Sequence, residues 1–328
     1  MAQNRYDGGL VVVLGATGVQ GGAVLRYFAQ ESKALSHSFR LRGLTRDPTS
    51  DAAQALSRAG VKMVKGDLDD VSSLHQAFEG ATHIFANTDS NRIMWDATRH
   101  PEYLAQGQSP AEYGAAIEKR HGAKIVEAAA AVPTLRRIVY SGLASPRRWS
   151  EGGYSKVAMF DVKEEIADMF RARRELQRKF SVVMVGFYAS DAALMPEVYA
   201  PEKLLDGHYE VAMHMAGDVP VPIADVETDL GNWVAALFQA DPGVVLVGAS
   251  ECLTWQQWLE LWGDHNRVMT TYRRASTDEV APGTEDFMRR LSKSLNSSRR
   301  SDLRVEWITP SIRHSFDQWA SQSGQHQS

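Results

Sequence analysis

Three glycines near the amino end of the chain are spaced as in loops that bind a dinucleotide. Gly15, Gly18 and Gly21 lie in the sequence LVVVLGATGVQGG, in which an apolar run leads directly into the glycines. In such a loop one glycine permits a tight turn, a second lets backbone N–H groups approach a pyrophosphate, and a third lets the next helix pack closely. The alternative is a chance cluster among 25 glycines. The predicted nucleotide contacts are Gly15, Thr17, Gly18, Val19, Gln20 and Gly21.

The residue after the second predicted strand bears on which dinucleotide would bind. An acidic residue there binds the ribose 2′-hydroxyl of NAD, whereas an arginine accommodates the 2′-phosphate of NADP. Here Arg46 follows the strand directly, and Glu31 is the only acid between Gly15 and Asp47. This pattern favours NADP(H). In the alternatives, Arg46 is a solvated loop charge, or Asp47 turns toward the ribose.

The ends of the third and fourth predicted strands complete the expected nucleotide site. Asp67 and Leu68 follow the third strand, and Asp67 is placed to bind the adenine amine. Asp69 and Asp70 are expected to cap the next helix. Asn87 ends the fourth strand and precedes a long polar stretch, which we expect to be a functional loop covering the nicotinamide end.

These residues require a scaffold of alternating strands and helices. The pattern predicts an α/β fold: a doubly wound parallel sheet of the Rossmann type with a smaller C-terminal α/β lobe. We expect a nucleotide-binding domain over 8–188 and a substrate or partner lobe over 189–328, with 219–248 returning to the first sheet. The expected strands are 10–14, 40–45, 62–65, 82–86, 137–140 and 181–185, and the expected helices are 22–30, 52–58, 72–78, 115–131 and 155–179.

Composition narrows the class of protein. The 328 residues are 44% hydrophobic and 23% charged, close to the average for soluble globular proteins, and the net charge is -4. This charge argues against a whole surface that binds nucleic acid. With one cysteine, Cys252, and no apparent signal peptide or membrane span, we expect a cytoplasmic protein, or one that is also nuclear. No metal site is expected.

Several segments in order along the chain resemble one family. GATGVQGG, LTRDP, GDLDDVSSLHQAFEG, VYSGLAS, FDVKEEIADMF and SFDQWASQ look like the NmrA-like family of atypical short-chain dehydrogenase/reductases. The resemblance implies a Rossmann domain, a smaller C-terminal lobe and NADP(H) binding. Its members include both reductases and nucleotide-sensing regulators.

The expected catalytic position departs from the wider superfamily. Classical members of that superfamily carry Y-x-x-x-K, whose tyrosine transfers a proton while the lysine binds the nicotinamide ribose. The lysine matched by the resemblance is Lys163, but Met159 stands four residues earlier. Lys163 is thus expected to bind the cofactor and to share proton transfer with other groups, or else to be an exposed lysine paired with Glu164 or Glu165. The other catalytic candidates are Tyr140, Ser141 and Tyr154.

The second half of the chain holds features without a clear catalytic pattern. We expect three tryptophans at i, i+3 and i+7 to form a buried helix face: Trp255, Trp258 and Trp262. His208 and His214 lack a metal-binding pattern. The basic residues from Arg289 to Arg304 are expected to be solvated charge.

The sequence therefore predicts an NADPH-dependent reductase of a small organic molecule with an atypical acid–base site. The alternative is a non-catalytic NADP(H) redox sensor that regulates a partner protein or transcription. The expected partners are a small-molecule substrate or a regulatory protein, without direct contact to nucleic acid or membrane.

Overall fold

The computed structural model of the protein describes residues 9–34, 39–153, 157–191, 199–213 and 216–275. The chain divides into two compact units that interleave along the sequence. The first comprises Met1–Ser145, Ala158–Met184 and Val226–Leu246, and the second comprises Pro146–Val157, Val185–Asp225 and Val247–Ser328.

The first unit is built on a seven-stranded parallel sheet in the order β11-β6-β5-β4-β1-β2-β3. Its strands are β1 (Leu10–Val13), β2 (Arg40–Thr45), β3 (Lys62–Lys65), β4 (His83–Ala86), β5 (Arg137–Gly142), β6 (Phe180–Val185) and β11 (Val245–Gly248). Both neighbours of β1 run parallel to it, with Val11 opposite Leu41 on β2 and opposite His83 on β4. From β1 the chain adds β2 and β3 on one side of the sheet and then β4, β5, β6 and β11 on the other. This reversal of the strand order confirms the doubly wound fold.

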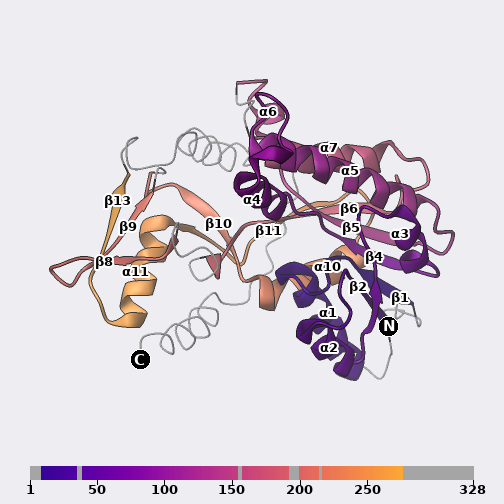
Figure 1. Ribbon diagram of the computed structural model, residues 1–328. Helices are drawn as coiled ribbons and strands as arrows, with labels where there is room; N and C mark the ends of the chain where they lie inside the picture. Colours follow the sequence, from indigo (N-terminus) through magenta and orange to yellow (C-terminus); the bar gives the residue numbers. More distant parts are fainter. Residues whose placement is uncertain (1–8, 35–38, 154–156, 192–198, 214–215, 276–328) are drawn as a thin grey trace. The chain divides into compact units, whose positions relative to one another are not determined.

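Helices cover both faces of this sheet (Figure 1). The helices α1 (Val19–Ala34), α2 (Asp51–Arg58) and α10 (Val226–Gln239) lie on one face. The helices α3 (Val71–Phe78), α5 (Pro110–Ala130) and α7 (Ala158–Ala172) lie on the other, and α4 (Asn91–Arg99) packs against α5. The strands between these layers are buried on both sides, and Val11, Val12 and Val13 have no exposed surface.

Two helix contacts in this unit depend on glycine. In α10, a Cβ on Gly231 would lie 2.2 Å from Cβ of Tyr27 in α1. In α5, a Cβ on Gly122 would lie 2.4 Å from Cγ1 of Ile166 in α7. Both helix pairs therefore approach more closely than any side chain at these positions would permit.

The second unit contains two three-stranded sheets and the helix α11 (Trp255–Asn266). The first sheet has the order β12-β10-β7, with β12 (Glu251–Thr254), β10 (Pro220–Ala224) and β7 (Phe187–Tyr188). The second has the order β13-β9-β8, with β13 (Thr270–Arg274), β9 (Tyr209–Met213) and β8 (Glu202–Lys203). A short helix, α6 (Pro146–Trp149), also belongs to this unit. The expected tryptophan face of α11 is confirmed, because all three indoles are buried.

Several sequence expectations need adjustment. Within 219–248, α10 and the first half of β11 belong to the first unit, whereas β10 pairs in the second. The polar stretch expected to be a loop is largely helical, because it forms α4 and the 3₁₀ turn Pro101–Tyr103 before α5 begins. The helix α5 begins at Pro110, five residues earlier than expected, because Ser109 caps it through a capping box with Glu112. No described helix combines the length and apolar composition that crossing a bilayer requires.

Candidate functional site

The glycine motif forms a tight, exposed loop between β1 and α1. Gly15 has φ of +58°, in the left-handed region that favours glycine, and its carbonyl accepts a 2.9 Å hydrogen bond from Gly18 N. A Cβ on Gly21 would lie 2.3 Å from the Gly15 carbonyl oxygen and 2.7 Å from that of Leu14. These are backbone atoms, so the first turn of the helix can sit this close to the strand only with glycine at 21.

Other predicted residues of this loop lie around the start of α1. Thr17, Gly18 and Val19 are exposed, and Gln20 is half-buried. The α1 sequence has no acidic residue in its first turn, so the partial positive charge of the helix end is not offset by one. The loop and helix end therefore present an open surface suited to an anionic group.

The end of β2 lies against the glycine loop. Ala16 N donates a 3.0 Å hydrogen bond to the carbonyl oxygen of Leu44, two residues before Arg46. Arg46 is exposed, and its guanidinium makes no hydrogen bond or ion pair with the part of the chain that the structure describes. The Asp47 carboxylate instead accepts hydrogen bonds from Thr49 N at 2.8 Å and Thr49 Oγ1 at 2.5 Å. These bonds hold the pKa of Asp47 below its usual value, and they direct its carboxylate toward Thr49 in the same loop.

The loop after β3 is fixed by its own aspartates. Asp67 is exposed, and its Oδ1 accepts a 2.9 Å hydrogen bond from Asp69 N. The predicted cap by Asp70 is confirmed, since its Oδ1 accepts from Ser72 N at 2.9 Å. Asp69 does not cap α3. Its carboxylate instead lies 3.2 Å from Nε2 of His121 in α5. The predicted contact Leu68 is half-buried beside Asp67.

The end of β4 connects the glycine loop to a buried cluster. The side chain of Asn87 lies against Gly15, because a Cβ there would be 2.7 Å from Asn87 Oδ1. The next residue, Thr88, points instead into the layer between the sheet and α5 and α7. Its Oγ1 donates a 2.5 Å hydrogen bond to Oε1 of Glu118 and lies 2.8 Å from the hydroxyl of Tyr140.

Lys163 joins this cluster from α7. Its Nζ lies 2.7 Å from Oε1 of Glu118 and 3.3 Å from Oγ1 of Thr88, and it also donates to the Thr88 carbonyl. The lysine side chain is 13% exposed and that of Glu118 is 0% exposed. The alternative of an exposed lysine paired with a neighbour on its own helix is therefore wrong, since Glu164 binds Arg171 and Glu165 binds Lys119.

Two further catalytic candidates, Tyr140 and Ser141, lie in β5 itself. Tyr140 is fully buried, and burial, reinforced by the negative charges of Glu118 and Glu164, raises its pKa well above 10.0 despite the Thr88 hydrogen bond. Ser141 is also buried. The fourth candidate, Tyr154, lies outside the described residues, as do His214 and the basic residues of 289–304.

Sequence reasoning missed Glu118 and the bonding of Thr88. A signal for Glu118 was present: buried positions of α5 include 114, 115, 118, 121, 122, 125 and 126, so a carboxylate stands on the apolar face of a helix. Thr88 had no comparable signal, because its partners come from three different elements.

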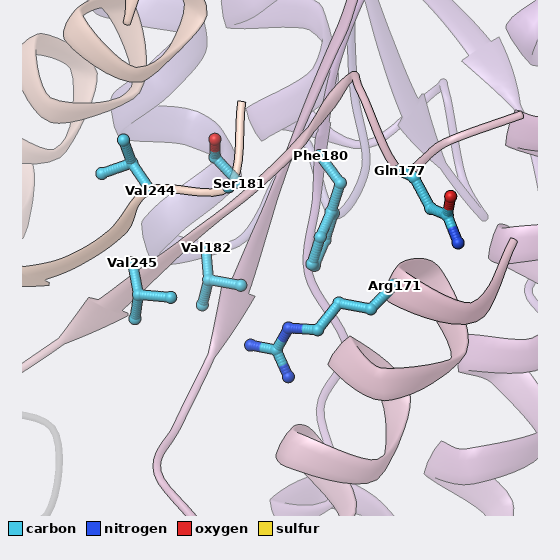
Figure 2. Close-up of a pocket in the computed structure, with 8 residues that line it drawn as sticks. Arg171, Gln177, Phe180, Ser181, Val182, Val244 and Val245 are labelled. Carbon is cyan, nitrogen blue, oxygen red and sulfur yellow. The ribbon is translucent and has the colours of Figure 1, made fainter. Parts of the chain in front are cut away.

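The structure also contains a pocket away from these residues. Its volume is about 230 Å³, and it lies beside the β6–β11 edge of the sheet, against the last turn of α7 (Figure 2). Val182 and Val245 face it together with Arg171, whose guanidinium is paired with Glu164 and Asp168. None of the predicted site residues lines it. Among the described residues, no group of three or more potential metal ligands is found.

The sequence matches a known protein family over most of its length. The sequence model of the NmrA-like family matches residues 7–283. The chain belongs to the NmrA-like family. This NmrA-like chain is 31% identical over 262 residues to the NmrA-like family domain-containing oxidoreductase hkm9 of Aspergillus hancockii, which covers 76% of this chain and 70% of hkm9. It is also 31% identical over 235 residues to oxidoreductase notA of Aspergillus sp. (strain MF297-2), which covers 70% of this chain but only 63% of notA.

Solved structures share the fold of this NmrA-like chain. NmrA, a negative transcriptional regulator, was solved in complex with NAD and with NADP; both structures give a TM-score of 0.69 over 96% of this chain and 92% of NmrA, at 19% and 18% identity. The triphenylmethane reductase of Citrobacter sp., complexed with NADP(H), gives a TM-score of 0.63 at 14% identity, over 94% of this chain and 99% of the reductase. One fold thus serves a regulator and a reductase.

Proposed function

We propose that this chain binds NADP(H) at the carboxyl edge of the first unit's sheet and uses it to reduce a small organic substrate. The proposal starts from the glycine loop, whose left-handed Gly15 and sterically required Gly21 make room for a pyrophosphate beside backbone N–H groups. The family relatives named as oxidoreductases and the structural neighbours that hold NAD or NADP support a nicotinamide dinucleotide.

The preference for NADP(H) rests on Arg46. Its exposed guanidinium has no partner in the described part of the chain, and Asp47, the nearest acid, is occupied by Thr49. A planar cation that follows β2, next to the glycine loop, is suited to bidentate binding of a 2′-phosphate. The free cation beside an occupied acid is the observation that carries this choice.

The reaction would divide between the cofactor and the chain. Bound NADPH supplies the hydride. Lys163 holds a proton at Nζ, where Glu118 and Thr88 keep the ammonium group fixed. Tyr140 has no exposed surface and a pKa well above 10.0, so we assign it the orientation of Thr88 rather than contact with a substrate. Ser141 and Tyr154 stay predictions for substrate contact.

The binding half of the proposal is tested by calorimetric titration with NADPH and NADH. We expect Arg46→Ala to weaken NADPH binding about tenfold or more and to leave NADH binding within about twofold, since a charge-assisted hydrogen bond contributes about 1.5–3 kcal/mol. The matched control is Arg40→Ala, because Arg40 is also exposed but begins β2 rather than following its end. Equal affinity of the unmodified protein for both nucleotides would remove the role of Arg46.

The catalytic half needs a separate measurement. We expect NADPH oxidation with at least one member of a panel of carbonyl, enone and imine compounds. Lys163→Met should lose most of kcat and also weaken NADPH binding, since Lys163 is expected to contact the nicotinamide ribose. A second candidate, a non-catalytic NADP(H) sensor, is favoured by one observation: the ammonium donors of Lys163 are already directed to Glu118 and Thr88. No turnover across the panel, together with capture of a partner protein that changes on adding NADPH, would favour the sensor.

A further inference from the structure

The Glu118–Lys163 ion pair is unusual because its acid is entirely inside the protein. Glu118 has no exposed surface, and its Oε1 receives both the Lys163 ammonium at 2.7 Å and the Thr88 hydroxyl at 2.5 Å. Its second oxygen, Oε2, is buried and makes no hydrogen bond with the described residues. A carboxylate in this position has lost its water and recovered only part of its hydrogen bonding.

Such a pair is a poor device for stability alone. Desolvation of two charges often costs more than their attraction returns, and apolar replacements are frequently as stable. The contact between α5 and α7 also has other support: Gly122 packs against Ile166, and Lys119 pairs with Glu165 at 2.7 Å on the surface. Joining the two helices therefore does not require a buried glutamate.

The partners of Lys163 are arranged to fix one atom. Its Nζ is held from α5 by Glu118 and from the end of β4 by the carbonyl and hydroxyl of Thr88. The Thr88 hydroxyl is in turn 2.8 Å from the hydroxyl of Tyr140 on β5. Groups from two elements thus contact the ammonium directly, and a third element reaches it through Thr88. The lysine side chain is 13% exposed.

We propose that Glu118 is a positioning residue that keeps the Lys163 ammonium charged and fixed at the end of β4. The effect of Glu118 on turnover rests on the proposed function, whereas its effect on the position of Lys163 does not. The counter-charge stabilises the protonated amine in a site with little water, and the Thr88 contacts set its direction. Glu118 is too deeply buried to touch a ligand itself.

The other charged groups around the pair are committed elsewhere. On α7, Glu164 binds Arg171 and Glu165 binds Lys119, while Asp161 accepts from Ser145 Oγ at 2.6 Å. On β5, Tyr140 stays protonated because burial and the charges of Glu118 and Glu164 raise its pKa. On α5, His121 and Lys124 face Asp69. Glu118 is therefore the carboxylate that faces Lys163.

The proposal is tested on the nucleotide-free protein by the reactivity of Lys163 toward acetic anhydride, quantified by peptide mass spectrometry at pH 8. An uncharged amine is acetylated and an ammonium is not. We expect Lys163 to react at least about tenfold faster in Glu118→Gln than in the unmodified protein, because the amine loses its counter-charge. Glu165→Gln removes the same charge from the surface pair between the same helices, and we expect it to leave Lys163 unchanged.

Conservative replacement separates charge from fold. Glu118→Asp keeps the negative charge on a shorter side chain, and we expect its Lys163 reactivity to lie closer to that of the unmodified protein. Circular dichroism of each variant establishes that the labelled protein is folded. If folded Glu118→Gln gives the same Lys163 reactivity as Glu165→Gln, Glu118 does not position the lysine. Should the glutamine variant not fold, the uncharged Glu118→Met takes its place in this comparison.

A second readout connects the pair to the reaction. With a substrate from the panel, we expect the alkaline limb of the kcat profile to move to lower pH in Glu118→Gln, while KM for NADPH changes less. Altered labelling without turnover on any substrate would contradict the reductase and leave the positioning role intact. Turnover with unaltered labelling would do the reverse.

Discussion

The two ends of the candidate site differ in the exposure and bonding of their charged and polar groups. At the glycine end, the loop is exposed, its polar groups belong to the backbone, and Arg46 has no partner among the described residues. At the Lys163 end, the charges are buried and already bonded to one another. The glycine end thus leaves the Arg46 guanidinium unbonded among the described residues, whereas the Lys163 end carries its own counter-charge in Glu118. Substitutions at the two ends should therefore fail in different ways.

The largest effect is expected at the open end, where backbone packing leaves no room. Gly21→Ala would place a Cβ 2.3 Å from the Gly15 carbonyl oxygen, so either the loop or the helix must move. We expect a loss of about 3 kcal/mol of stability or more and NADPH binding weakened beyond about a hundredfold. Thermal unfolding and calorimetric titration measure the two.

The adjacent glycine provides the control for that substitution. The three atoms nearest to a Cβ on Gly22 would all belong to the guanidinium at the end of the Arg26 side chain, the closest of them at 2.9 Å. Gly22→Ala should then leave stability within about 1 kcal/mol, because alanine is also the better helix former. Equal damage from both substitutions would mean that the close approach at Gly21 is not what shapes the loop.

At the closed end, the expected effect is a strong coupling between two side chains. Lys163→Met alone leaves the Glu118 carboxylate buried without its counter-ion, which should cost about 3 kcal/mol. Adding Glu118→Gln should recover much of this loss, so that the double-mutant cycle gives a coupling of about 2 kcal/mol. Urea unfolding of the four proteins measures it.

The surface pair between the same helices provides the reference cycle. Lys119 and Glu165 have side chains 52% and 43% exposed, and their coupling should stay below about 1 kcal/mol. Similar coupling energies in the two cycles would show that burial does not distinguish these two ion pairs.

The smallest effect is expected from the hydroxyl that ends the buried network. Tyr140→Phe removes its hydrogen bond with Thr88 and should cost about 1 kcal/mol at neutral pH. The folded pKa of Tyr140 lies above its unfolded value of about 10, so the stability it contributes is present below pH 10 and is lost as the pH rises further. The difference in stability between the two proteins should therefore shrink above pH 10.

Unfolding midpoints measured from pH 8 to 11 test that dependence. Tyr103→Phe is a suitable control, because Tyr103 is 51% exposed and should show no such change. A difference for Tyr140→Phe that is constant across this range would indicate that the phenol ionises in the folded protein as readily as in the unfolded chain.

Local patterns were enough to predict the scaffold and the open end. Gly15 and Gly21 serve within one strand–loop–helix segment, so their geometry follows from neighbouring residues, and the doubly wound sheet follows from the alternation of strands and helices. The closed end was not predictable in this way. Glu118 and Lys163 are 45 residues apart in the sequence and meet only because α5 and α7 pack side by side. The spacing of residues along the chain does not encode that contact.

The error over the polar stretch after β4 has a similar origin. Its composition indicated a loop, but α4 forms there and packs against α5. Tertiary packing thus outweighs a weak local preference. The buried face of α5 was readable from its period, and a glutamate on that face was the available sign that a partner had to exist.

The packing of α10 against α1 also determines the order in which the first unit can be completed during synthesis. Tyr27 and Gly231 meet in this contact, and the Arg26–Glu227 pair beside it joins residues 201 positions apart. A ribosome must therefore make more than two hundred residues before the helix of the glycine loop acquires its neighbour. Contacts between residues so far apart in the sequence form slowly. During synthesis, the side of α1 that packs against α10 therefore stays exposed until α10 has been made.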